Sequence, residues 1–116
     1  MNSYNKILQQ DGITSDELIK LLELREKGEV DFLLVDVREE FEYNSAHIDG
    51  VDILAPTSSF RSWIGEFIQK YKNKSIIFTC RTDNRSGQVC NILRKYGINA
   101  INHLGGIVSY RGKIIK

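Results

Sequence analysis

The sequence predicts an α/β domain built around a largely parallel sheet. Short unbroken apolar runs are the first observation behind this prediction, because a strand covered on both sides has no polar face. The amphipathic segments that alternate with these runs are the second. The third is the length of 116 residues, which is typical of a single domain.

The first predicted element is a helix that begins after Thr14. The hydroxyl of Thr14 and the carboxylate of Glu17 form a capping box, in which each side chain satisfies a free backbone amide at the helix start. Gly28 suits the left-handed conformation that ends such a helix. One face of the helix is apolar through Leu18, Leu21 and Leu22.

Buried strands are predicted at 32–35 and 76–78, and weaker ones at 51–54, before Pro56, and at 98–101. Apolar residues at spacings of three and four predict a core-facing helix between the strands: Phe60, Trp63, Ile64, Phe67, Ile68 and Tyr71. Another helix is predicted from about Ser86 to Tyr96, with an apolar face at Val89, Cys90, Ile92 and Leu93.

Composition excludes several classes of function. The 16 basic and 15 acidic side chains leave a formal net charge of +1, so no global field favours nucleic acid or a membrane. The polar segment 1–10 lacks the apolar stretch of a signal peptide or membrane span, which predicts a cytoplasmic protein with reduced cysteines. Two histidines, and two cysteines ten residues apart, make no spacing typical of a zinc site.

The chemistry is expected at residues 79–87, because ligands of parallel sheets bind where a strand leads into a helix. The helix start directs partial positive charge toward Cys80, and Arg81 and Arg85 add formal charge. Each effect favours the thiolate, which is the nucleophilic form of cysteine. A small buried hydrophobe is the alternative for Cys80, but the polar run at 81–86 suits an anion-binding turn better than a core.

Cys80 is therefore the predicted nucleophile and sulfur carrier. We expect the backbone amides of residues 81–86 to hold its thiolate and the outer sulfur of a persulfide. Arg81 and Arg85 are expected to orient an anionic donor, and Ser86 to hydrogen-bond the sulfur or cap the helix. The other predicted substrate-binding residues of this loop are Thr82, Asp83 and Asn84.

This loop resembles the active loop of the rhodanese family, Cys-x-x-Gly-x-Arg, with Cys80 and Arg85 at its two ends. Three further segments resemble the family's motifs in the right order: an Asp-x-Arg at 36–38, a His-Ile-x-Gly at 47–50 and a Gly-Gly turn at 105–106. The resemblance covers about residues 12–112 and so predicts a single rhodanese-like domain over 1–116.

The resemblance implies a parallel five-stranded sheet with helices on both faces. It also implies a sulfurtransferase: the thiolate takes a sulfane sulfur from thiosulfate or a persulfide and passes it to cyanide, a thiol or a thioredoxin-like protein. Neither a metal nor an organic cofactor is implied. Two residues depart from the family. Asp83 replaces a glycine whose position favours positive φ, and its charge opposes a dianionic donor, while Tyr110 replaces a tryptophan.

Three alternatives were weighed against a free-standing sulfurtransferase. A cysteine-dependent phosphatase or arsenate reductase needs five residues between cysteine and arginine, but that arginine position holds Ser86 here, and the shorter loop favours sulfur. A regulatory module typically lacks the cysteine, which is present. A partner-dependent persulfide carrier has the same loop and stays open.

Other reactive side chains are expected to be structural. Cys90 lies about one to two turns into its helix, which favours core packing over a disulfide with Cys80. His47 is expected to make a structural hydrogen bond, and nothing beside His103 indicates a role. Arg38 is expected to pair with a carboxylate of residue 39 or 40.

Overall fold

The computed structural model describes residues 3–116 and contains one five-stranded sheet. Its strand order is β1-β6-β5-β2-β4, and every neighbouring pair is parallel. The strands are β1 (Gly12–Ile13), β2 (Leu33–Asp36), β4 (Ile53–Leu54), β5 (Ser75–Thr79) and β6 (Asn99–His103). The predicted α/β architecture is confirmed. Met1 and Asn2, which belong to the predicted domain, lie outside the described residues.

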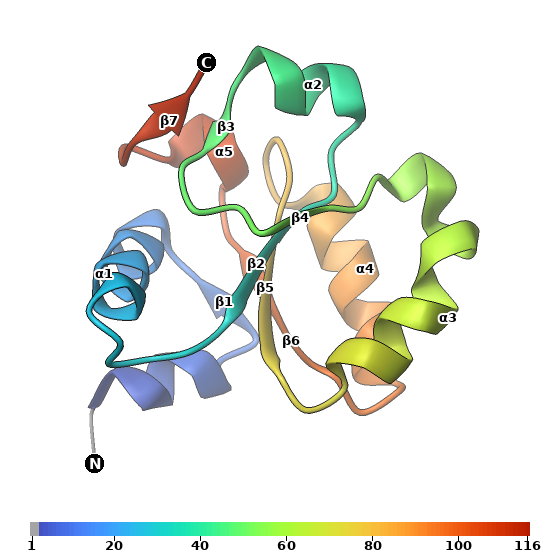
Figure 1. Ribbon diagram of the computed structural model, residues 1–116, viewed down its shortest axis with the longest axis horizontal. Coiled ribbons are helices and arrows are strands. Elements are labelled where there is room, and N and C mark those ends of the chain that lie inside the picture. The colour runs from blue at the N-terminus through green and yellow to red at the C-terminus, as the bar shows by residue number, and fades with distance from the viewer. Residues whose placement is uncertain (1–2) are drawn as a thin grey trace.

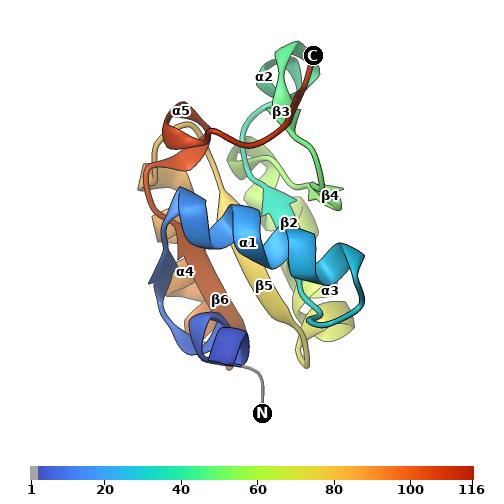
Figure 2. The same cartoon turned by 90° about the vertical axis from the view of Figure 1, so that its left-hand side faces the viewer.

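Helices cover both faces of the sheet. Helix α1 (Ser15–Glu26) lies on one face, while α3 (Phe60–Tyr71) and α4 (Asn84–Arg94) lie on the other (Figure 1). The view turned by 90° shows α1 in front of the strands (Figure 2). Because β5 is the central strand, it is flanked by β6 on one side and β2 on the other.

Several short elements were not predicted from the residue pattern. They are strand β1, the 3-10 helices η1 (Ser3–Gln9) and η2 (Thr57–Ser59), helices α2 (Glu40–Ser45) and α5 (Gly106–Ser109), and the antiparallel strands β3 (His47–Ile48) and β7 (Ile114–Ile115). Helix α2 and the β3–β7 ribbon lie beyond the carboxyl ends of the central strands (Figure 1). They therefore partly enclose the carboxyl-end edge of the sheet, where the site was expected.

The predicted capping box begins α1. The amide of Glu17 donates to the Thr14 hydroxyl over 3.2 Å, and the amide of Thr14 donates to the Glu17 carboxylate over 2.9 Å. Gly28 follows the helix with φ +76°, the left-handed conformation that its position indicated. The expected apolar face differs at one position. Leu18 and Leu21 are buried as expected, but the third buried leucine is Leu24, while Leu22 is only partly buried.

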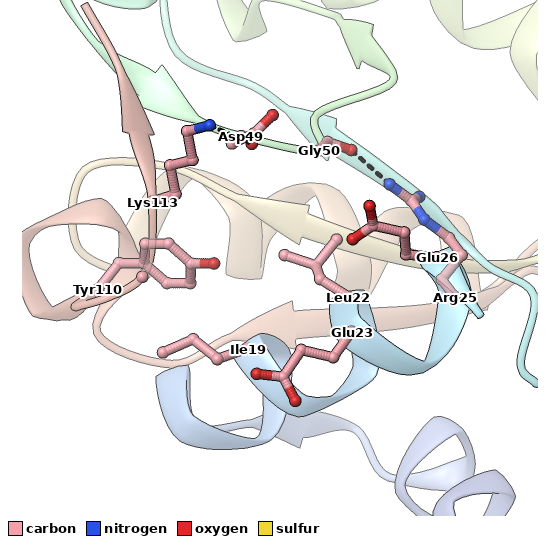
Figure 3. Close-up of a pocket in the computed structure, with 10 residues that line it drawn as sticks. Ile19, Leu22, Glu23, Arg25, Glu26, Asp49, Gly50, Tyr110 and Lys113 are labelled. Carbon is pink, nitrogen blue, oxygen red and sulfur yellow. Dashed lines mark hydrogen bonds and ion pairs between the residues drawn. The ribbon is translucent and has the colours of Figure 1, made fainter.

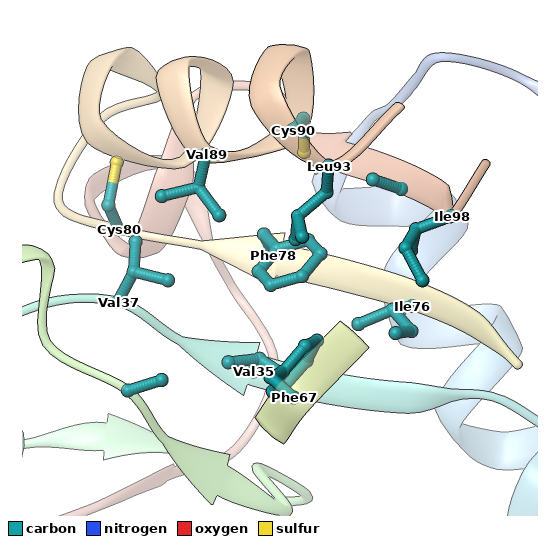
Figure 4. Close-up of a cluster of buried hydrophobic side chains, with 12 residues drawn as sticks. Val35, Val37, Phe67, Ile76, Phe78, Cys80, Val89, Cys90, Leu93 and Ile98 are labelled. Atoms are coloured by element: carbon teal, nitrogen blue, oxygen red, sulfur yellow. The ribbon is translucent and has the colours of Figure 1, made fainter. Parts of the chain in front are cut away.

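The sheet divides the core into two layers. The layer beneath α1 is formed by residues of η1, α1 and the strands, including Leu8, Ile13, Leu34, Ile77 and Ile101. The opposite layer, beneath α3 and α4, contains Val35, Phe67, Phe78, Val89 and Leu93 together with both cysteines (Figure 4). The core-facing prediction for Trp63 and Phe67 is confirmed, because Phe67 is buried and Trp63 packs partly buried against this layer.

Helix α4 begins at Asn84, two residues before the predicted start. The amide of Gly87 donates to the carbonyl of Asp83 over 2.9 Å, which makes Asp83 the residue that opens the helix. Asp83 has φ −163°, which is extended backbone. The expectation that this position favours a positive φ is therefore wrong, and the aspartate is accommodated without left-handed strain.

Within residues 3–116, no helix combines the length and the apolar character that crossing a bilayer requires.

Candidate active site

Cys80 directly follows the central strand β5 and lies at its carboxyl end. Its residue surface is 1% exposed, and it belongs to the core layer that includes Val37 and Val89. Figure 4 shows its sulfur between the end of β5 and the first turns of α4. The sulfur is therefore covered by the loop at 81–83 and by the helix start that this loop leads into.

Ser86, in the first turn of α4, makes two contacts with this sulfur. Its backbone amide donates to the Cys80 Sγ over 3.5 Å, and its hydroxyl lies 3.3 Å from the same atom. Amides in the first turn of a helix have no partner within the helix and carry its partial positive charge. Among residues 3–116, the hydrogen bonds to this sulfur come from Ser86, so of the amides predicted to hold it at 81–86 only that of Ser86 does so in this structure.

Asn102 on β6 sets the orientation of the Ser86 side chain. The Ser86 hydroxyl donates to Asn102 Oδ1, and the Asn102 amide donates to the carbonyl of Asp83 over 3.3 Å. The Asp83 carbonyl, 3.3 Å away, is a further acceptor for this hydroxyl. A hydroxyl has one proton, so a bond to an anionic sulfur at Cys80 takes the place of those to Asn102 and Asp83. The serine can therefore turn its proton toward a thiolate without moving its oxygen.

The Gly-Gly turn and α5 anchor the Cys80 loop through hydrogen bonds. The amide of Ile107 donates to the Cys80 carbonyl over 2.9 Å, and that of Val108 donates to the Arg81 carbonyl over 3.1 Å. In a trans peptide the amide points opposite to the carbonyl, so the amides of Arg81 and Thr82 point away from α5. The Asp83 carboxylate also accepts from the amide of Gly105 over 3.3 Å.

Arg85 is bound by a carboxylate from α2. Its two terminal nitrogens donate to the two carboxylate oxygens of Glu42 over 2.7 and 3.0 Å. These hydrogen bonds, helped by one from the backbone amide of Glu39, lower the pKa of Glu42 to about 2. The arginine that was expected to orient a donor is thus already paired.

Arg38 pairs with Asp36, so the expected pairing with residue 39 or 40 is wrong. Its guanidinium binds both oxygens of the Asp36 carboxylate, with distances of 2.9 to 3.1 Å, and both side chains are almost fully buried. Residues two apart in extended chain point to the same side, which brings these two together. Glu39 instead opens α2, where its carboxylate accepts from the Ser58 amide.

The other predicted loop residues lie at the surface. Arg81, Thr82, Asp83 and Asn84 are all exposed. In the part of the chain that the structure describes, no ion pair involves Arg81. The loop therefore exposes the guanidinium of Arg81, which has no ion-pair partner among the described residues, while the sulfur of Cys80 is buried.

Both histidines have structural contacts. His47 stacks on Tyr43 with 3.9 Å between ring centroids, and its Nδ1 lies 3.0 Å from the Tyr43 carbonyl oxygen, as its expected structural role requires. His103 is fully buried between the hydroxyls of Thr79 and Ser15, each 2.8 Å from a ring nitrogen. Burial lowers the pKa of His103 to about 4. His103 therefore links the residue before Cys80 to the start of α1.

A hollow of about 490 Å³ lies elsewhere, between α1 and the C-terminal segment. Figure 3 shows Tyr110 and Lys113 facing Ile19, Leu22 and Glu23 across it. None of its lining residues comes from the Cys80 loop. Within residues 3–116, no group of three or more His, Cys, Asp or Glu side chains is placed to hold a metal ion.

The sequence model of the rhodanese-like domain matches residues 17–113. The chain belongs to the rhodanese-like domain family. A rhodanese-like domain protein from Staphylococcus aureus has a similar structure, with a TM-score of 0.72 and 30% identity over 90% of this chain and 94% of that one. A rhodanese-related protein from Thermoplasma volcanium is 23% identical with a TM-score of 0.75, over 91% of this chain and 98% of that one, and shares the fold.

Curated relatives are longer than this rhodanese-like domain. A tRNA uridine(34) hydroxylase from Bacillus licheniformis is 33% identical over 87% of this chain, which spans 34% of that protein. A probable adenylyltransferase/sulfurtransferase, MoeZ, from Mycobacterium tuberculosis is 34% identical over 66% of this chain, which spans 19% of that protein. The domain thus corresponds to one part of these larger proteins.

Two residues of the site were missed by sequence reasoning. Glu42 stands three residues after Glu39, the spacing of a capping box, and this signal would have placed it at the start of a helix. Asn102 directly follows the strand predicted at 98–101, at the carboxyl end where parallel sheets carry site residues, and this position was the available signal. Neither signal indicates that the side chain reaches the Cys80 loop, because both contacts cross long stretches of sequence.

Proposed function

We propose that this rhodanese-like domain is a sulfurtransferase that carries sulfur as a persulfide on Cys80. The observation that carries the proposal is the hydrogen bond from the Ser86 amide, at the start of α4, to the Cys80 sulfur. Such a donor stabilises an anionic sulfur, and the neighbouring hydroxyl adds a second donor when the thiolate forms. We place the reaction in the cytoplasm, where reducing conditions suit a free thiol; both cysteines are free.

Sulfur moves without net oxidation or reduction. The Cys80 thiolate forms a bond with the outer sulfur of thiosulfate or a persulfide. The sulfur–sulfur bond of the donor breaks, and its electron pair leaves on sulfite or on the donor's thiolate. An acceptor such as cyanide, a thiol or a thioredoxin-like protein then attacks the outer sulfur of the Cys80 persulfide and regenerates the thiolate.

Transfer within a larger assembly is the second candidate, in which Cys80 relays sulfur between partners. Two observations favour it: Cys80 is almost fully covered, and the curated relatives continue well beyond the length of this domain. Their names include a sulfurtransferase activity and a tRNA hydroxylation. A phosphatase is disfavoured, because the position at which its loop would carry an arginine holds Ser86, and the neighbouring Arg85 is bound to Glu42.

Mass spectrometry of the intact protein tests sulfur loading. After incubation with thiosulfate or methyl persulfide, we expect a mass increase equal to one sulfur atom, with sulfite released from thiosulfate. The increase should persist in Cys90→Ala and be absent in Cys80→Ser, while both variants keep the native circular dichroism spectrum. Sulfur uptake by folded Cys80→Ser, or none by the unaltered protein from either donor, refutes the assignment.

Turnover separates the two candidates. A free-standing sulfurtransferase returns to its starting mass when cyanide or a small thiol is added, with thiocyanate or a new persulfide formed. A partner-dependent carrier stays loaded under the same conditions, because its acceptor is a protein surface.

A further inference from the structure

Together with Glu42, the Cys80 loop at residues 79–87 carries two positive and two negative side chains. Arg81 and Arg85 are the positive side chains. Asp83 lies in the same loop, and Glu42 binds Arg85 directly from α2. A pair of uncompensated arginines attracts a dianion strongly, whereas a neutral group of charges does so weakly.

Glu42 binds Arg85 through the geometry of two hydrogen bonds as well as through its charge. Both terminal nitrogens of the guanidinium are bound, at 2.7 and 3.0 Å, in the bidentate arrangement that suits a carboxylate best. The Glu42 side chain is 19% exposed and stays ionised at neutral pH. Arg85 is therefore engaged with α2 and is not free to receive the oxygens of a sulfonate group.

We propose that Glu42 determines the donor class of this site, which takes an organic persulfide in its uncharged form, R–S–S–H, in preference to the thiosulfate dianion. The inference rests on the proposed function, because it concerns the donor of the same transfer. Glu42 acts through Arg85 and is a specificity-determining residue, not a catalytic one.

The transfer from such a donor, R–S–S–H, is balanced. The Cys80 thiolate bonds to the outer sulfur, the donor's sulfur–sulfur bond breaks, and the electron pair leaves on R–S⁻, which takes a proton from water. The products are a Cys80 hydropersulfide and R–SH. With thiosulfate, sulfite departs instead, and more negative charge gathers on the loop during the transfer. A neutral loop stabilises that additional negative charge less well than a positive one does.

The test compares Glu42→Gln with the unaltered protein, using thiosulfate and methyl persulfide as donors. Gln keeps the size of the side chain and removes its charge, which frees the charge of Arg85. We expect the second-order rate constant for loading Cys80 from thiosulfate to rise about tenfold. The constant for methyl persulfide should change by less than about twofold. Glu42→Asp, which keeps the charge, should retain the original ratio of the two constants.

Asp31→Asn is the matched control, because it removes the same charge from an exposed ion pair with Lys74. Asp31 precedes β2 and Cys80 follows β5, so they lie at opposite ends of this parallel pair. Neither rate constant should change in this variant. An effect as large as that of Glu42→Gln would mean that net charge, and not the Arg85 pair, decides the donor, and would overturn the proposal.

Ionic strength gives a readout that needs no variant. A neutral loop predicts that thiosulfate loading of the unaltered protein changes little as salt is raised, whereas loading of Glu42→Gln falls steeply. A steep fall in the unaltered protein overturns the proposal. Equal changes for both donors in Glu42→Gln, or no change, also overturn it but leave sulfur transfer by Cys80 in place. The proposed function itself fails when neither donor loads the unaltered protein, or when folded Cys80→Ser still takes up sulfur.

Discussion

The backbone of Gly106 lies against the carbonyl of Thr82 so closely that a β-carbon at position 106 would be 2.3 Å from that oxygen. Gly106 also has φ +59°, which disfavours any side chain. The amide that follows it, that of Ile107, donates to the carbonyl of Cys80. The second glycine of the Leu-Gly-Gly segment is therefore required by its contact with the sulfur-bearing loop.

Gly106→Ala should displace this loop and destabilise the protein. The positive φ costs about 1 kcal/mol, and the contact with backbone that cannot rotate away adds at least as much. We expect the free energy of unfolding in urea to fall by about 2 kcal/mol or more, with slower sulfur loading of Cys80.

Gly65→Ala is the matched control for this substitution. Gly65 lies in α3, and a β-carbon there would have nothing within 4 Å. Alanine should raise the free energy of unfolding by about 0.5–1 kcal/mol, because it favours helix more than glycine does. Equal stability of the two variants would contradict the contact between the turn and the loop.

Ser86→Ala should slow the loading of Cys80 while the fold survives. The backbone amide that donates to the sulfur stays, but the hydroxyl 3.3 Å from it is lost. We expect the rate constant for loading to fall about tenfold, the effect of one hydrogen bond to a charged atom. Ser62→Ala, which removes an exposed hydroxyl bound to the Ser59 carbonyl, should leave the rate unchanged. An unchanged rate in Ser86→Ala would contradict the role of the hydroxyl.

Cys90 should be unreactive in the folded protein. It is fully buried, and burial raises the pKa of its thiol to about 12. In Cys80→Ser, we expect iodoacetamide at neutral pH to label the protein only after urea is added, as measured by mass. Labelling of Cys90 under native conditions would show that α4 opens readily. Cys90→Ala should lower the free energy of unfolding by about 1–2 kcal/mol through the cavity it leaves.

His103 should make the protein less stable in mild acid. In the unfolded chain its imidazole gains a proton near pH 6.5, whereas burial lowers its pKa in the folded protein to about 4. The unfolded state therefore binds the proton first, and stability that is fully present above pH 6.5 is lost as pH falls toward 4. Nuclear magnetic resonance of the ring should give a midpoint near 4; a midpoint near 6.5 would show that the ring is hydrated.

The fold was predictable because its main elements carry local signals. The capping box at Thr14 and the aromatic stripe of α3 depend on neighbouring residues, and both are found where the sequence indicated. Short strands such as β3 and β7 were not predicted, because they pair with each other across a long stretch of sequence. The start of α4 was misplaced by two residues, since no side chain caps it.

The sequence by itself determined the order of the four predicted apolar strands and the three main helices along the chain, the place of Cys80 after a buried strand, and the arginine five residues later. These follow from apolar periodicity and from spacing along the chain, which act over a few residues. Only the tertiary structure decided which charges meet, because Glu42 and Arg85 are far apart in sequence. Chain folding brings α2 beside α4, and an ion pair between them cannot be deduced from either segment alone.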